Sequence, residues 1–113
     1  MSWPKASAEK EALLDELVQG LPCEKKRMFG APCFFAKHSM FTGVFAEDIF
    51  IRLPEEERAR FVKENRGAKP FEPVEGRKMS EYLIVPHAML KNKGSVRDWL
   101  RISFDYASTL KKK

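Results

Sequence analysis

The sequence predicts an α+β fold in which a single antiparallel sheet of about five strands is packed with three helices. The main observation is the block of residues 28–53, where apolar runs of strand length are separated by turn-like breaks at 30–32, 37–39 and 47–48. This pattern is typical of consecutive antiparallel strands joined by tight turns. Segments with helix-start signals flank the block, so the predicted order is α-β-β-β-β-α-β-α.

The first helix is expected to begin after Ser7, which is a suitable N-cap residue. Acidic residues follow near its start, where the helix dipole favours anions. Gly20 and Pro22 end the helix. Its apolar side is predicted to consist of Leu13, Leu14, Leu17, Val18 and Leu21, which recur at helical spacing. Four strands then follow, at residues 25–29, 32–36, 40–46 and 48–53.

The second helix is expected to begin at Pro54, because proline is favoured at the first helical position and three glutamates come directly after it. It should end at Asn65 and Gly67. Residues 67–79 are predicted to be an irregular connection, since they contain two prolines and two glycines.

The last strand is predicted at residues 81–85 and is closed by Pro86. Ser95 is then expected to be the N-cap of a long final helix, with Asp98 completing an arrangement close to a capping box. An apolar stripe through Trp99, Leu100 and Phe104 should pack this helix on the sheet.

The 113 residues are expected to form one domain, 1–113, with a core at about 8–110. No segment has the apolar length needed to span a membrane, and the first residues do not resemble a secretory signal. Two cysteines do not suggest a disulfide framework. We therefore expect a cytoplasmic protein without a membrane partner.

The positive charge of the chain is concentrated at its end. Residues 91–113 hold seven lysines and arginines and two aspartates. Their net charge of +5 equals that of the whole chain. Such asymmetry permits contact with nucleic acid, for which the candidate residues are Lys91, Lys93, Arg97 and Arg101. The interpretation we prefer is a solvated helix face followed by a lysine tail, since no aromatic residues interleave the tail.

Several short motifs occur in an order that resembles a known family. The first half contains MFG at 28–30, CFF at 33–35, MFTGV at 40–44 and IRL at 51–53. The second half contains GAKPF at 67–71, GRKM at 76–79 followed by Tyr82, and the pattern WLxxSxxYA at 99–107. Together these motifs resemble the N-terminal domain of the TfoX/Sxy family over about residues 8–110.

The resemblance implies a compact domain with an antiparallel sheet, similar to the layout predicted above. It also implies a connection with regulators of natural DNA uptake in bacteria. Full-length members carry a second, C-terminal helical domain that resembles helix-hairpin-helix modules, and the 113 residues contain no segment corresponding to it. The chain is therefore expected to be a standalone copy of the N-terminal domain.

Neither a metal site nor a catalytic site is predicted. Structural zinc usually needs four closely spaced ligands, whereas Cys23 and Cys33 are ten residues apart and His38 and His87 would have to complete the set. Cys33 lies in an apolar run, where a thiol is more often inert than activated. We expect no cofactor and no enzymatic activity.

Arg52 is the most informative charged residue, because it ends a strand and shares a face with Phe50. Arg77 and Lys78 follow in the irregular connection, and two arginines could bind an anion. The alternative that we favour is a structural anchor, in which Arg52 pairs with an acid or a carbonyl of the 67–81 connection.

Adjacent apolar pairs such as Phe34–Phe35 place large side chains on both faces of the predicted sheet. Either helices cover parts of both faces or a second subunit covers one of them. We predict a homodimer, with the interface candidates Phe34, Phe35, Phe41, Phe45 and Phe50. Base stacking on these rings is a weaker alternative, because little positive charge lies beside them.

The sequence therefore predicts a non-enzymatic interaction or regulatory domain whose protein partner is not identified. The alternative is a nucleic-acid-associated accessory protein that uses the basic C-terminal helix. A small enzyme ranks third, because nothing in the sequence indicates a reaction.

Overall fold

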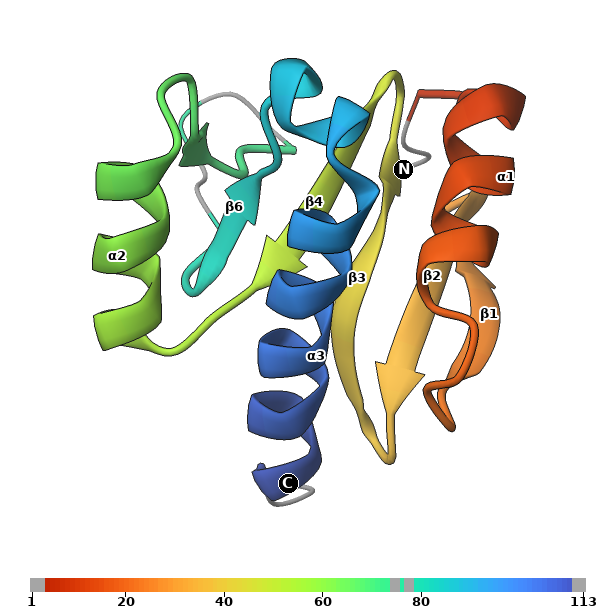
Figure 1. Cartoon of the computed structure of the whole chain (residues 1–113). Helices are drawn as coiled ribbons and strands as arrows, with labels where there is room; N and C mark the ends of the chain where they lie inside the picture. Colours follow the sequence, from red (N-terminus) through yellow and green to blue (C-terminus); the bar gives the residue numbers. More distant parts are fainter. Residues whose placement is uncertain (1–3, 74–75, 77–78, 111–113) are drawn as a thin grey trace.

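The computed structural model describes residues 4–73, 76 and 79–110 (Figure 1). Helix α1, Ala8–Leu17, begins after Ser7 as predicted, and the Ser7 hydroxyl accepts a hydrogen bond from the backbone N–H of Lys10 at 3.2 Å. The other helical elements are α2 at Glu55–Glu64, the short 3-10 helix η1 at His87–Lys91 and α3 at Lys93–Thr109.

The described residues form one antiparallel sheet of six strands in the order β1-β2-β3-β4-β6-β5. The strands are β1 Glu24–Met28, β2 Ala31–Ala36, β3 Ser39–Phe45, β4 Asp48–Arg52, β5 Lys69–Pro70 and β6 Tyr82–Ile84. The predicted fold class and element order are confirmed. The sixth strand is the two-residue β5, which lies in the segment predicted to be an irregular connection.

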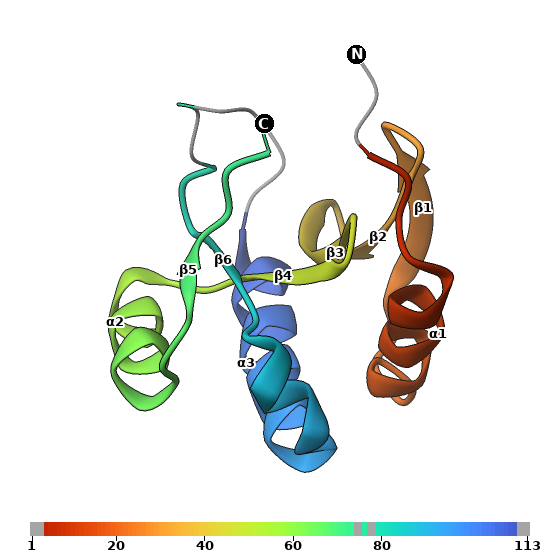
Figure 2. The same ribbon diagram turned by 90° about the horizontal axis from the view of Figure 1, so that it is seen from above.

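Figure 2 shows all three helices on the same side of the sheet. The main core lies on this side, where α1 and α3 pack against β2, β3 and β4. It includes Leu14, Phe34, Phe41, Ile51 and Leu100, each at most 3 % exposed. The final helix is therefore packed on the sheet, as its apolar stripe predicted.

The opposite face of the sheet has its own apolar cluster, to which Cys33, Phe50 and Tyr82 belong. No described helix covers this face. Instead the chain after β5 folds over it, and the Phe71 ring stacks on Phe50 with their centroids 4.4 Å apart. The adjacent apolar residues of the strands thus serve two cores within one chain.

The start of α3 differs from the prediction. The helix begins at Lys93, two residues before Ser95, and its N-cap is Asn92, whose side-chain oxygen accepts a hydrogen bond from the Ser95 backbone N–H at 3.2 Å. Ser95 is therefore the third residue of the helix, and its backbone N–H donates to the N-cap side chain instead of Ser95 being the N-cap itself. Both residue types favour the N-cap position, so the local sequence alone did not distinguish them.

Asn92→Ala should lower the free energy of unfolding by about 1 kcal/mol, because the Ser95 N–H loses its acceptor at the helix start. Ser95→Ala should have a much smaller effect, since the Ser95 backbone still donates to Asn92. Urea denaturation of both variants would test this, and equal losses would contradict the assignment of Asn92 as the cap.

Candidate functional site

A cluster of polar side chains lies where β4 ends and β6 begins. Arg52, the last residue of β4, places its Nε 2.8 Å and its Nη2 2.7 Å from Oε1 of Glu81. Tyr106, from the C-terminal half of α3, donates its hydroxyl hydrogen to Oε2 of the same carboxylate. Three segments distant in sequence thus meet at the Glu81 carboxylate. We call Arg52, Glu81 and Tyr106 the Glu81 cluster.

Aromatic and basic groups surround this cluster. The Arg52 guanidinium lies 5.3 Å from the centroid of the Tyr82 ring, and the Tyr82 hydroxyl donates to the Met40 carbonyl oxygen at 2.9 Å. Arg58, in the first turns of α2, donates from Nη1 to the Leu53 carbonyl oxygen at 2.6 Å. The cluster therefore joins the sheet end to α3, and Arg58 ties the start of α2 to Leu53, the residue directly after β4.

The ionisation of these groups follows from partial burial and mutual contact. Burial alone would raise the pKa of Glu81, but hydrogen bonds from Tyr106 and Arg52 lower it below its usual value of 4.5. Burial alone would lower the pKa of Arg52, yet the hydrogen bond to Glu81 and nearby charges leave that pKa raised. Burial, followed by the Glu81 contact, raises the pKa of Tyr106. The cluster thus holds a carboxylate, a guanidinium and a neutral phenol near neutral pH.

The predicted contact between Arg52 and an acid of the 67–81 connection is present, and the acid is Glu81. Arg77 and Lys78, which were candidates beside it, lie outside the described residues. Tyr106 belongs to the WLxxSxxYA pattern, but the sequence predicts no role for it. The α3–β6 approach that brings Tyr106 to Glu81 has no local sequence signal.

The five interface phenylalanines occupy two kinds of position. Phe34, Phe41 and Phe50 are at most 3 % exposed and serve the cores of the chain itself. These three therefore do not form an exposed patch. Phe35 and Phe45 are partly buried on the helix-free face of the sheet. They are the members of the predicted set that remain accessible for an interface.

The basic residues proposed for nucleic acid are partly paired within the chain. Lys93 Nζ lies 3.1 Å and Arg97 Nη2 lies 3.8 Å from Oε2 of Glu16 in α1. Lys91 and Arg101 are exposed. The stretch is thus a mixed surface and not a continuous basic stripe.

The cysteines and histidines do not converge. Cys33 is fully buried, and burial raises its pKa to about 11, which suppresses the reactive thiolate. Burial also raises the pKa of Cys23. His38 is exposed, and His87 contacts Asp48 at 2.9 Å. Across the part of the chain that the structure describes, no group of three or more metal-binding side chains is found.

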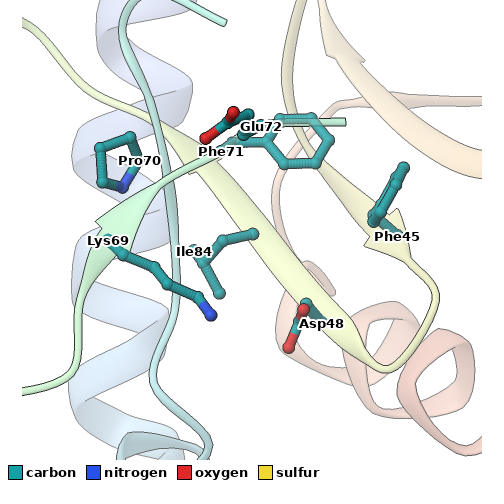
Figure 3. Close-up of a pocket in the computed structure, with 7 residues that line it drawn as sticks. All are labelled: Phe45, Asp48, Lys69, Pro70, Phe71, Glu72 and Ile84. Atoms are coloured by element: carbon teal, nitrogen blue, oxygen red, sulfur yellow. The ribbon is translucent and has the colours of Figure 1, made fainter. Parts of the chain in front are cut away.

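A pocket of about 200 Å³ lies beside β5 (Figure 3). It is lined by Phe45, Asp48, Lys69, Pro70, Phe71, Glu72 and Ile84. Phe71 is 1 % exposed and Ile84 is 6 % exposed, and Phe71 packs edge-to-face on Phe45 with the centroids 5.2 Å apart. The apolar lining is thus largely used by internal packing, and the pocket offers a small ligand little apolar surface.

Within the described residues, the architecture defines a class of protein, a small α+β domain with a six-stranded antiparallel sheet and helices on one side. None of the described helices is long and apolar enough to cross a membrane.

Comparison with protein families shows that the TfoX N-terminal domain matches residues 13–107. The chain belongs to the TfoX N-terminal domain family. No curated protein matches it, and no solved structure matches it. The resemblance stated on the basis of the short motifs is thereby confirmed.

Proposed function

We propose that this chain is a non-enzymatic interaction domain that acts in the cytoplasm in the regulation of bacterial DNA uptake. The observation that carries the proposal is the match of residues 13–107 to the TfoX N-terminal domain, whose family is associated with competence regulators. The burial of Cys33 and the pairing of Lys93 and Arg97 with Glu16 favour this role over an enzyme or a nucleic-acid-binding protein.

A genetic experiment tests the regulatory role. The gene would be deleted in its native host, and uptake of a marked DNA fragment and transcript levels of the uptake genes would be measured. We expect both quantities to change and to return when the intact gene is supplied. Unchanged uptake and unchanged transcripts in the deletion strain would contradict the proposal.

A DNA-binding experiment distinguishes the proposed role from the alternative of a nucleic-acid-binding protein. If the chain were a nucleic-acid-binding protein, it would retard labelled DNA at low salt and release it steeply as salt is raised. Lys91→Glu combined with Arg101→Glu would then weaken that binding. We expect no retardation by the unchanged protein, and a salt-dependent shift that these substitutions abolish would favour the alternative.

We further propose that the chain forms a homodimer through the helix-free face of the sheet. Phe35, Phe45, Met28, Met40 and Met79 are partly buried there. Apolar side chains gathered on a face without a helix favour a protein interface, and a symmetric pairing of like surfaces is the commonest arrangement.

Light scattering at micromolar concentration tests the dimer. The unchanged protein should give twice the 13.1 kDa mass of one chain. Phe35→Glu should reduce the mass to that of the monomer, because it places a charge in the apolar interface. Val62→Glu is the matched control, since Val62 is 47 % exposed on α2. A monomeric mass for the unchanged protein, or dissociation by both substitutions, would contradict this interface.

A further inference from the structure

Glu81 occupies a backbone position that normally belongs to glycine. It is the third residue of the turn 79–82, which is closed by a hydrogen bond from the Tyr82 N–H to the Met79 carbonyl oxygen at 3.2 Å. Its φ angle is +76°, in the region that a type II turn requires at this position and that glycine adopts most readily. A glutamate here holds a strained backbone, and its carboxylate makes contacts with Arg52 and Tyr106 that glycine could not make.

The surroundings of the Glu81 carboxylate resemble a receptor for an anion. Arg52 presents two nitrogens to it from β4, and Tyr106 presents a hydroxyl from α3. Arg58, from α2, is close enough for its charge to lower the pKa of Glu81. Arg52 and Tyr106 belong to β4 and α3 and not to the 79–82 turn, although the Leu53 N–H ties the turn to the end of β4 through the Glu81 carbonyl oxygen at 2.9 Å.

The Glu81 carboxylate and the Arg52 guanidinium do not form two parallel hydrogen bonds. Both Arg52 nitrogens contact the same oxygen, Oε1, at 2.8 and 2.7 Å, while Oε2 is bound by Tyr106. A guanidinium binds a carboxylate or phosphate best when two parallel hydrogen bonds reach two different oxygens. An oxyanion that is not tethered to the strained turn can adopt that geometry.

We propose that Arg52 and Tyr106 form a binding site for a small oxyanion, a carboxylate or a phosphate, and that Glu81 occupies it as an internal substitute. The side chains of Arg52 and Glu81 are 22 % and 28 % exposed, so an ion from solvent can reach the site. Binding would displace the Glu81 carboxylate from Arg52 and Tyr106, while backbone hydrogen bonds continue to hold the 79–82 turn. This goes beyond the proposed interaction role and supplies a way for a ligand to free the Glu81 side chain at the surface of the domain.

Because the turn favours glycine at position 81, a glycine substitution at this position can test the proposal. Glu81→Gly removes the internal carboxylate and relieves the backbone strain, so the fold should be kept while the site is vacated. The variant and the unchanged protein would be titrated with sodium phosphate and sodium acetate, against sodium chloride at equal ionic strength. Thermal unfolding would report binding, since a ligand of the native state raises the midpoint.

We expect Glu81→Gly to bind at least one of the two anions roughly tenfold more tightly than the unchanged protein, because the competing carboxylate is gone. The comparison of phosphate with acetate identifies the preferred oxyanion. Adding Arg52→Gln should abolish the effect. Backbone NMR signals of residues 52, 81 and 106 should shift on binding in Glu81→Gly, should shift at higher anion concentration in the unchanged protein, and should not shift once Arg52→Gln is added. If Glu81→Gly does not fold, the same titration is made on Glu81→Gln, which removes the charge and keeps the shape.

Equal responses to chloride, phosphate and acetate would overturn the proposal. A phosphate or acetate response that persists after Arg52→Gln would also overturn it, because the ion would then bind elsewhere on the surface. Neither result depends on the role in DNA uptake, so this proposal and the proposed function can fail separately.

Discussion

Replacing Trp99 by alanine should lower the free energy of unfolding by about 3–5 kcal/mol. The indole is 5 % exposed and packs edge-to-face against Phe61 of α2, with the ring centroids 4.9 Å apart. The Arg60 guanidinium lies 4.2 Å from the centroid of the Trp99 ring and also covers that ring. The ring thus joins α3 to α2, and its removal leaves a cavity that a packed core cannot fill.

Chemical denaturation with linear extrapolation would measure this loss. Asp98→Ala is the matched control, because Asp98 is the preceding residue of the same helix and is exposed. Its substitution should change stability by less than about 0.5 kcal/mol. A loss below about 1 kcal/mol for Trp99→Ala would show that the ring is not part of the core.

The hairpins and helices could be predicted because their signals are local. Strands β2 to β4 have apolar runs of strand length, and each is separated from the next by a short polar turn. The position of β5 could not be predicted in this way. It has two residues, and its place depends on Phe71 stacking on Phe50, a contact between segments about twenty residues apart.

The same distinction between local sequence signals and contacts of distant segments applies to the candidate site. Arg52 stands at a strand end beside an apolar face, so an acid partner in the following connection could be expected. Tyr106 lies 25 residues beyond Glu81, and the two meet because α3 packs across the sheet. The positive φ of Glu81 likewise has no sequence signal, since glutamate is not a residue that indicates such a turn.

The burial of Phe34, Phe41 and Phe50 also changes how the aromatic strand block is interpreted. Adjacent large residues indicated more apolar surface than three helices could cover, and the chain covers part of it with Phe71. The surface left for a second subunit is accordingly smaller, and it is centred on Phe35, Phe45 and the neighbouring methionines. A dimer through this face would therefore be sensitive to a single charge.

Gly43 is a residue whose importance the sequence did not reveal. It lies in the middle of β3, where it is paired with Cys33 of β2 and Phe50 of β4. A Cβ atom at this position would lie 2.6 Å from Cζ of Phe50 and 2.9 Å from the backbone carbonyl oxygen of Pro32. Glycine is therefore required here by the close approach of the Phe50 ring, which is itself held in place by Phe71.

Gly43→Ala should consequently lower the free energy of unfolding by about 1–3 kcal/mol, because the Phe50 ring and the β2 backbone must move apart. Gly94→Ala is the matched control, since the nearest atom to its Cβ would be Oδ1 of Asn92 at 3.7 Å and alanine favours the helix. The two substitutions add the same methyl group, so their opposite expected signs isolate the steric effect. Urea denaturation would measure both, and a neutral or stabilising Gly43→Ala would show that the Phe50–Phe71 stack has room to shift and does not fix the second core.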